Sequence, residues 1–409
     1  MAPDRPAGFR EVFAVAEYRA LWLSALLSRV GDQLARVALA LLTFNRTGSA
    51  VLTTLVYSLT FVPALLGGPL LGGLADRFPR RRVMVSCDVA RTGLIALMAV
   101  PHAPFAVLCI LLFTAQLLDS PENAARSATT PVVLAGDRLA IGIAASQMMF
   151  QAGGLVGFAV GGVVVAATGA PVALVLDAAT FALSAGIVFF GVENRPAAQS
   201  GTGPDRVVSG VKIVVGDRRL RSLLGLALLA GFYVVPTALA VPYAAQAHLG
   251  AGDAGLLMAA LPAGNVIGVA VLNRFVSPAT RLRCLGPLAV LASLPLVICA
   301  FHPGLAESLA AWSVSGALTS YQVVANAAFV RRVSNQVRGR VMGLAGSLLT
   351  AVQGLGMIIA GLAAASLGPD RAIAACGTAG VIVGIPVAMA WNRTRNTTPT
   401  GVVSVEVPA

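Results

Sequence analysis

Twelve apolar stretches, most of them long enough to cross a bilayer, occupy the greater part of this chain of 409 residues. A helix needs about 20 apolar residues to cross the hydrocarbon core of a membrane. Because a backbone in lipid must satisfy its own hydrogen bonds, such stretches form helices, and the alternating pattern of a membrane β-barrel is absent. The composition, 57% hydrophobic and 11% charged, agrees. The sequence therefore predicts an all-α polytopic membrane protein.

The predicted spans fall into two sets of six. They cover residues 18–44, 51–75, 83–100, 105–118, 139–167, 172–192, 220–244, 254–275, 282–301, 305–330, 341–367 and 372–391. The fourth span is short, and we expect its helix to continue through Asp119 and Glu122. A polar stretch with a Pro/Gly/Ser-containing start separates the sets and is typical of a flexible linker. We predict an N-terminal six-helix bundle (1–192), a linker (193–219), a C-terminal bundle (220–391) and a polar tail (392–409).

Basic residues lie almost wholly on one side of the predicted topology. Of the 29 Lys and Arg residues, 24 lie on the side of the termini and the even-numbered gaps, either in these segments or at the adjoining ends of spans. By the positive-inside rule this side is cytoplasmic, so both termini are cytoplasmic and the number of spans is even. The net charge of +12 is explained by this topology and by attraction to anionic lipids, so we expect no nucleic-acid partner. The expected location is a bacterial-type inner (plasma) membrane.

The two sets of spans resemble one another. Residues 74–78, which leave the second span, match residues 271–275, which leave the eighth. Arg138 and Gln151 match Arg340 and Gln353 at one common offset. A six-plus-six duplication is the architecture of many secondary transporters. The alternative is chance similarity between apolar segments. Charged residues at matching loop positions argue against it.

The loop after the second span carries a motif of glycines, an aspartate and arginines. Residues 72–82 read Gly-Gly-Leu-Ala-Asp-Arg-Phe-Pro-Arg-Arg-Arg. This closely resembles the signature between spans two and three of the major facilitator superfamily, with matches at Gly72, Asp76, Arg77, Arg80 and Arg81 and a proline in place of the second glycine. The resemblance implies twelve helices in two pseudo-symmetric six-helix bundles, which this loop holds together in one state of the cycle. A generic basic loop would explain only the arginines.

The fifth predicted span carries a second motif. Its glycines at spacings of four, Gly153, Gly157, Gly161 and Gly162, resemble the antiporter motif of the same superfamily, with Phe158 in place of the proline. Such glycines form a smooth stripe into which a partner helix can pack. The resemblance implies proton-coupled export, whereas close packing alone is the alternative.

Further stretches narrow the resemblance to one branch. Residues 209–221 are similar to the amphipathic segment that enters the seventh span in macrolide-efflux and enterobactin-exporter-like facilitators, and so are Gly31-Asp32, residues 121–131 and Asp177-Ala178. The resemblance covers nearly the whole chain. It implies that the cargo is a small molecule leaving the cell.

Charges inside the spans are the proton-coupling candidates. Arg29, Asp32 and Arg36 share one face of the first span, so Asp32 can pair with either arginine. We expect this face to meet a wet cavity, where Asp32 exchanges a proton, but a permanent structural triad stays open. Asp119 and Glu122 are the second candidate, with solvated helix-end charges as the alternative.

Two further charged positions in the spans have simpler explanations. Asp88 and Arg91 share a face of the third span, and we expect a structural pair. Asp177 begins the sixth span, where capping of the helix competes with a functional role.

Scattered polar side chains suit an amphipathic substrate. The resemblance implies that spans one, four, seven and ten line a cavity. The expected substrate contacts are Gln147, Gln151, Tyr233, Tyr321, Gln322, Asn326 and Gln353. Few hydrogen-bonding groups in an apolar cavity favour an organic molecule over an inorganic ion. For each of these residues, bonding between helices is the alternative.

We therefore expect a monomeric secondary active transporter that exports an antibiotic, drug or siderophore-like compound by proton antiport, with membrane lipids around it. An importer or uniporter is the alternative, and a receptor or lipid scramblase on the same scaffold is less favoured because the outer loops are short. The sequence contains no phosphate-binding loop and no CxxC pair among its five cysteines, and its three histidines form no catalytic constellation. We expect neither an enzyme nor a cofactor or metal.

Overall fold

A computed structural model describes residues 9–71, 74–101, 103–195, 211, 213–334 and 337–397 of the chain. Helices account for nearly all of these ranges, which contain no β-strand. This confirms the predicted all-α fold. The chain divides into two compact units, one of Met1–Thr43 and Val62–Gly201 and the other of Phe44–Phe61 and Thr202–Ala409.

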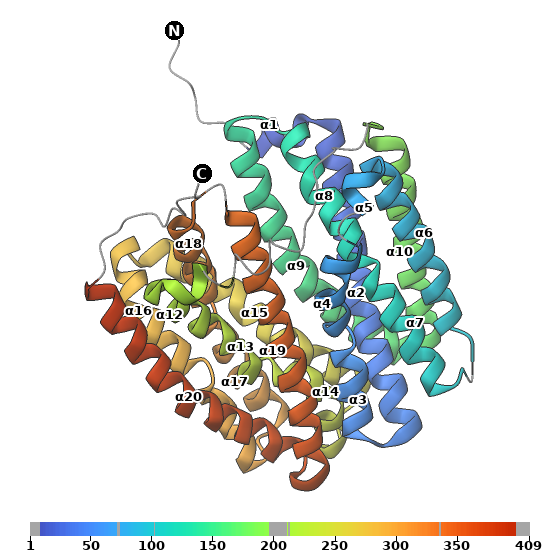
Figure 1. Cartoon of the computed structure of the whole chain (residues 1–409). Coiled ribbons are helices and arrows are strands. Elements are labelled where there is room, and N and C mark those ends of the chain that lie inside the picture. Colours follow the sequence, from blue (N-terminus) through green and yellow to red (C-terminus); the bar gives the residue numbers. More distant parts are fainter. Residues whose placement is uncertain are drawn as a thin grey trace. The chain divides into compact units, whose positions relative to one another are not determined.

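The first unit contains the helices drawn in blue to green in Figure 1, apart from α3. They are α1 (Phe9–Ala14), most of α2 (Ala16–Thr47), α4 (Val62–Leu71), α5 (Leu74–Arg77), α6 (Arg80–Met98), α7 (Phe105–Leu117), α8 (Asp119–Val133), α9 (Asp137–Thr168) and α10 (Ala170–Gly191). α6 packs along α10 and α8. Apolar side chains of α2, α6, α8 and α10 form a buried cluster at one end of this bundle, so the four helices hold each other in register.

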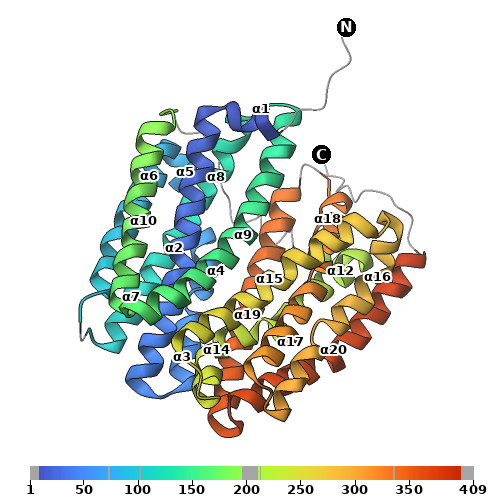
Figure 2. The same cartoon turned by 180° about the vertical axis from the view of Figure 1, so that it is seen from behind.

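The second unit contains α3 (Ala50–Ser58) and the helices of the C-terminal half, which Figure 2 shows from behind. They are α12 (Arg218–Leu228), α13 (Ala230–Tyr233), α14 (Val235–Gln246), α15 (Ala251–Phe275), α16 (Pro278–Leu291), the 3-10 helix η1 (Leu294–Phe301), α17 (Leu305–Leu318), α18 (Tyr321–Arg332), α19 (Arg338–Leu367) and α20 (Pro369–Thr397). α15 packs along α17, and α20 along η1 and α16.

Eight helical segments of the described ranges are long and apolar enough to cross a membrane. They correspond to predicted spans four to nine, eleven and twelve. Large apolar side chains on them face outward, among them Phe190, 87% exposed, and Phe275, 78% exposed. Such faces are stable against lipid and costly in water. The chain is therefore a multi-pass membrane protein, while the count of twelve spans stays a prediction.

The fourth and the second predicted spans each contain more than one helix. The fourth continues from α7 into α8 through Asp119 and Glu122, as expected. The second, predicted as one helix, is interrupted by turns at residues 59–61 and continues as α4. Pro63 lies in the first turn of α4, where the absence of its backbone N–H does not break a helical hydrogen bond. The break therefore places Pro63 at the part of a helix where a proline is best tolerated.

The seventh predicted span is also divided, into α12, α13 and α14. The N–H of Phe232 bonds to the carbonyl of Leu229, three residues before it, and Pro236 follows in the first turn of α14. These features tighten and interrupt the helix, leaving carbonyl groups of its first segment available to other donors.

The contacts of α3 differ from the predicted domain scheme, which assigns it to the N-terminal bundle. In the structure α3 packs against α19 and α14. Gly361 of α19 permits this approach, because a Cβ there would lie 1.8 Å from Thr54 Oγ1. The predicted domain boundaries and the internal repeat stay predictions.

Candidate functional site

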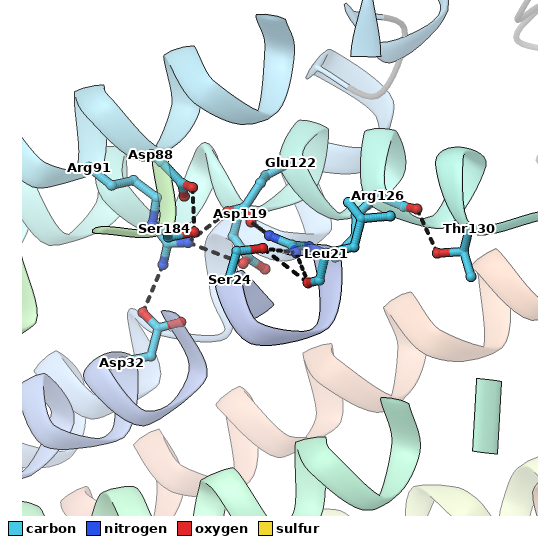
Figure 3. Close-up of polar contacts among 10 residues, drawn as sticks. All are labelled: Leu21, Ser24, Asp32, Asp88, Arg91, Asp119, Glu122, Arg126, Thr130 and Ser184. Carbon is cyan, nitrogen blue, oxygen red and sulfur yellow. Dashed lines mark hydrogen bonds and ion pairs between the residues drawn. The ribbon is translucent and has the colours of Figure 1, made fainter. Parts of the chain in front are cut away.

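A buried arginine in the first unit lies between three carboxylates from two other helices (Figure 3). Arg91 of α6 is 1% exposed. One of its terminal nitrogens, Nη2, lies 2.7 Å from Asp32 of α2. The other, Nη1, lies 3.2 Å from Glu122 and 3.4 Å from Asp119, both of α8. We call these four residues the Arg91 cluster.

The packing of α6 against α10 holds Arg91 in this position. The Arg91 guanidinium lies over the Phe181 ring, 4.0 Å from its centroid, where the ring quadrupole attracts a cation. One turn away along α10, the hydroxyl of Ser184 donates to Asp88 at 2.7 Å. Phe181 and Ser184 therefore provide one wall of the cluster.

A second arginine connects α8 to α2. Arg126 Nη2 lies 2.5 Å from Glu122, one turn earlier in α8. Its Nη1 donates to the Leu21 carbonyl at 2.6 Å and to the Ser24 hydroxyl at 2.7 Å. Glu122 thus accepts from two arginines. Because Arg91 belongs to α6 and Arg126 bonds to α2, a change in the charge of Glu122 affects the contacts of α8 with both helices.

The structure brings three of the five predicted proton-coupling residues together. Asp32, Asp119 and Glu122 share Arg91, although they come from two helices that are far apart in sequence. Arg29 lies over the Phe150 ring of α9, 3.7 Å from its centroid, and Arg36 donates to Gln33 at 3.4 Å. Asp32 thus forms an ion pair with Arg91 of another helix, whereas the sequence predicted a pair within the first span.

Two other expectations need correction. Asp88 does not form the expected pair with Arg91, since it accepts from Ser184 while Arg91 faces the other three carboxylates. Asp177 does not cap its helix, because α10 begins at Ala170 and Gly169 occupies the N-cap position. Asp177 lies in the third turn, fully buried. Both side chains face into the bundle rather than toward a helix end.

The structure describes part of the loop at residues 72–82, which the resemblance predicts to act as a gate between the two bundles. Gly72 and the side chain of Asp76 lie outside the described residues, and Arg77 is exposed. Arg80 donates to the Ala128 carbonyl of α8 at 2.7 Å. The Arg81 guanidinium lies 4.6 Å from the centroid of the Phe189 ring of α10. These two arginines attach the start of α6 to its neighbours, which is what a structural role requires; a gating role stays a prediction.

The glycine stripe of the fifth span packs against α2. A Cβ at Gly157 would lie 2.8 Å from the Val30 carbonyl oxygen, and one at Gly161 would lie 3.1 Å from the Leu34 Cα. Gly153 faces the aliphatic part of Arg29 at 3.2 Å, and Gly162 is buried. Gly157 therefore brings the α9 backbone against the helix that carries Asp32. Close packing is observed, and proton coupling remains a separate proposal.

In the second unit, three of the predicted substrate contacts form one hydrogen-bonded group at the break in span seven. Tyr321 donates to the Leu226 carbonyl at 2.7 Å, and Gln322 donates to the Ala227 carbonyl at 2.9 Å. Gln322 also lies 2.5 Å from the Tyr233 hydroxyl. Tyr321 and Gln322 thus bond carbonyl groups near the break of α12 and join helices, while substrate contact stays a prediction.

The other predicted contacts are dispersed. Gln147 and Asn326 are exposed on α9 and α18, and Gln151 and Gln353 are half-buried on α9 and α19. Two of the seven predicted contacts belong to the first unit and five to the second, so neither unit by itself contains the whole predicted set.

Charges outside the spans form structural pairs. Asp217 accepts from the N–H groups of Arg219 and Leu220, and its other oxygen lies 3.0 Å from Arg332 Nε. Burial alone would raise the pKa of Asp217, but the backbone donors and the Arg332 guanidinium hold it below its ordinary value. At the other end of this unit, His302 Nδ1 lies 2.8 Å from Asp370.

Among the described residues, no group of three or more His, Cys, Asp or Glu side chains has the arrangement of a metal site. The five cysteines are free thiols. Arg91 and Arg126 are the functional candidates that sequence reasoning missed. A signal was present, since an arginine within an apolar span needs partners from neighbouring helices.

Comparisons with known proteins agree with this architecture. Multidrug efflux pump Tap of Mycobacterium tuberculosis (strain ATCC 25618 / H37Rv) is 25% identical over 356 residues, covering 83% of this chain and 84% of that protein. Macrolide efflux protein A of Streptococcus pyogenes is 21% identical over 382 residues, covering 90% and 94%. This bears out the resemblance to the macrolide-efflux branch.

Solved structures are similar over nearly the full length. A bacterial homolog of the human lysosomal transporter Spinster, in an inward-facing and occupied conformation, matches with a TM-score of 0.74 at 15% identity, covering 97% of this chain and 98% of that one. The sequence profile of the Major Facilitator Superfamily matches residues 21–304, more than half of the chain. The chain is therefore a member of the major facilitator superfamily of membrane transporters.

Proposed function

We propose that this chain is a secondary active exporter of hydrophobic or amphipathic small molecules, driven by proton antiport across the inner membrane. The observation that carries the proposal is the Arg91 cluster, in which three carboxylates share one buried arginine. The names of the relatives, a multidrug efflux pump and a macrolide efflux protein, support export of an antibiotic or drug.

The cluster has the chemistry that coupling requires. While Asp32 is ionised, it holds Nη2 of Arg91, and Glu122 and Asp119 share Nη1. A proton on Asp32 removes the attraction at Nη2, so Arg91 is drawn toward the two carboxylates of α8 and the attraction between α2 and α6 weakens. Protonation thereby changes the relative stability of two helix arrangements, which is what a transporter needs from its coupling ion.

In this proposal the substrate contacts polar groups in apolar surroundings. Tyr233 and Gln322 offer hydroxyl and amide groups beside the break in span seven. Discontinuous helices in transporters free backbone carbonyls for ligands, and here side chains occupy those carbonyls. An amphipathic molecule with few hydrogen-bonding groups suits such surroundings better than an inorganic ion does.

The proposal is tested with purified protein in sealed lipid vesicles, with erythromycin and ethidium as probes of two chemical classes. An imposed pH gradient is expected to drive accumulation of at least one probe against its gradient. Asp32→Asn is expected to abolish gradient-driven accumulation but to retain exchange of labelled for unlabelled probe. Asp137→Asn, which changes an exposed carboxylate in the first turn of α9, serves as the matched control.

Each outcome is decisive for one part of the proposal. If accumulation by the unchanged protein ignores the pH gradient, proton antiport is wrong. If Asp32→Asn responds to the gradient as the unchanged protein does, Asp32 is not the coupling site. If neither probe moves in either direction, export of these drug classes is wrong. Accumulation in the same direction as the proton flow would instead indicate an importer.

A further inference from the structure

A second buried carboxyl lies beside the Arg91 cluster without a cation of its own. Asp177 of α10 is 0% exposed. Among the described residues its Oδ2 atom has no hydrogen-bond partner, and no lysine, arginine or histidine lies within ion-pair distance of it. Its Oδ1 atom is 3.4 Å from the Thr180 hydroxyl, which donates mainly to the Asp177 backbone carbonyl at 2.8 Å. The side chain thus lacks the contacts that stabilise a buried negative charge.

Asp177 is directed at the helix that carries Asp32. A Cβ built on Gly31 would lie 2.2 Å from Asp177 Oδ1, so the carboxyl occupies the space that any side chain at position 31 would need. Asp32 is the next residue of α2. The absence of a side chain at Gly31 therefore lets a carboxyl of α10 lie directly against the backbone beside the proposed coupling site.

The same face of α10 continues into the cluster. Phe181, one turn after Asp177, stacks on Arg91, and Ser184 donates to Asp88. Positions 177, 181 and 184 lie on one stripe of the helix. Asp177 is thus the end of a row of α10 side chains that face Arg91 and its partners.

The charge balance around this row is negative. The charged groups that face it are Asp32 of α2, Asp88 and Arg91 of α6, and Asp119, Glu122 and Arg126 of α8, while α9 carries Asp137 and Arg138 in its first turn. With Asp177, five carboxyls surround Arg91 and Arg126. Arg29 of α2 lies over the Phe150 ring, while Arg36 of α2 donates to Gln33 and adds a third positive charge near Asp119, so carboxyls still outnumber the arginines. An ionised carboxyl buried in a membrane protein without a cation is costly, so Asp177 is expected to be neutral in this arrangement.

We propose that Asp177 is a second proton carrier of the transport cycle, protonated in this arrangement and exchanging its proton with Asp32 across Gly31. The step is a proton transfer alone: the Asp177 O–H bond breaks, an O–H bond forms on Asp32, and Asp32 leaves Arg91 as a neutral acid. Asp177 then carries the negative charge until it takes a proton from water. This inference rests on the proposed proton antiport.

The protonation state is tested first, by a measurement that does not depend on transport. Infrared spectroscopy of the purified protein in lipid is expected to contain the carbonyl stretch of a buried protonated carboxyl, sensitive to exchange into D2O. Asp177→Asn removes that band, Asp177→Glu moves it, and the control Asp137→Asn leaves it unchanged. A band that persists in Asp177→Asn and disappears in Asp88→Asn would assign the proton to Asp88 and overturn the proposal.

The transport role is tested second, in the vesicles described above. Asp177→Asn is expected to lose gradient-driven accumulation and retain exchange, as Asp32→Asn does. If Asp177→Asn accumulates probe normally while Asp32→Asn does not, Asp177 is no carrier although antiport stands. If the unchanged protein ignores the gradient, the proposed function fails, and the infrared band still decides whether Asp177 is protonated. Should Asp177→Asn not fold, Asp177→Glu provides both measurements.

Discussion

At the scale of single residues, the arrangement around Arg91 is both costly and tightly determined. A buried guanidinium loses its hydration, and only partners with good geometry restore that energy. Here each terminal nitrogen has a carboxylate partner, and an aromatic ring covers one face of the guanidinium. The site is therefore stable with the arginine present and strongly destabilised when it is absent.

Arg91→Met is expected to lower the free energy of unfolding by about 3–5 kcal/mol, because it leaves carboxylates buried without their cation. Arg91→Lys is expected to lose less, since an ammonium keeps the charge but cannot bond three carboxylates as a planar guanidinium does. Unfolding of the purified protein in mixed micelles measures both. Arg274→Met, at an exposed position of α15, is the control and should change little. Equal stability of Arg91→Met and the control would contradict the account.

The residue scale is also where sequence reasoning reached its limit. The spacing of Arg29, Asp32 and Arg36 correctly identified Asp32 as a charge that needs a partner. The partner is Arg91, 59 positions away, because helix packing brings α6 to α2. Local spacing contains no information on that packing. Capping was an open alternative for Asp177 because a sequence gives helix bounds only to within a few residues.

At the scale of elements, glycines set how closely helices approach. The α9 stripe was predicted, but the backbones of α15 and α17 approach more closely than those of α9 and α2, and sequence analysis did not single out that pair. A Cβ at Gly268 would lie 2.1 Å from the Ala317 carbonyl oxygen, and one at Gly316 would lie 2.1 Å from that of Leu261. These atoms are backbone, so they cannot move aside without moving a helix.

Gly268→Ala is therefore expected to destabilise the protein by about 1–3 kcal/mol, because the helices must separate. Gly346→Ala in α19 is the matched control, since nothing lies within 4 Å of the added methyl group. Alanine there should stabilise the helix by up to about 1 kcal/mol. Thermal unfolding in detergent measures both variants. A Gly268→Ala variant as stable as Gly346→Ala would show that the contact between α15 and α17 is looser than described.

The start of α12 gives a prediction on pH. The pKa of Asp217 is lower in the folded protein than its ordinary value, so its ion pair stabilises the fold above about pH 4 and the contribution is lost as the pH falls through the folded pKa. Asp217→Asn retains a capping oxygen and removes only the charge. It should lower the unfolding temperature at pH 7, and the difference should shrink toward pH 3. A difference independent of pH would contradict the ion pair.

The sequence predicted best which segments form helices, because a long apolar stretch in lipid can satisfy its backbone hydrogen bonds only as a helix. The shapes of those helices were harder to predict. The divisions at residues 59–61 and within span seven arise next to Pro63 and Pro236, yet Pro262 lies inside the continuous helix α15. Neighbouring packing decides whether a proline ends a helix, and hydropathy does not describe that packing.

At the scale of the whole molecule, the distribution of charge determines orientation. Outward-facing apolar side chains define the surface that lipid covers, and arginines gather at one set of helix ends. Because insertion retains Lys and Arg on the cytoplasmic side, this asymmetry predicts the side of every loop. In the predicted orientation Asp177, near the start of α10, lies toward the outer side, from which the proposed proton antiport would take up its proton.

The predicted orientation is tested by labelling single cysteines in a cysteine-free variant, in intact cells, with a membrane-impermeant thiol reagent. Pro101→Cys and His248→Cys, at exposed turns predicted outside, should react in intact cells. Asp137→Cys and Thr280→Cys, at exposed helix starts predicted inside, should react only after the cells are opened. Since these four positions sample both units, they also test whether the number of spans between them is as predicted. Reaction of Asp137→Cys and His248→Cys under the same condition would mean an error in that number, whereas the reverse pattern at all four positions would mean that the chain is inverted and that Asp177 faces the cytoplasm.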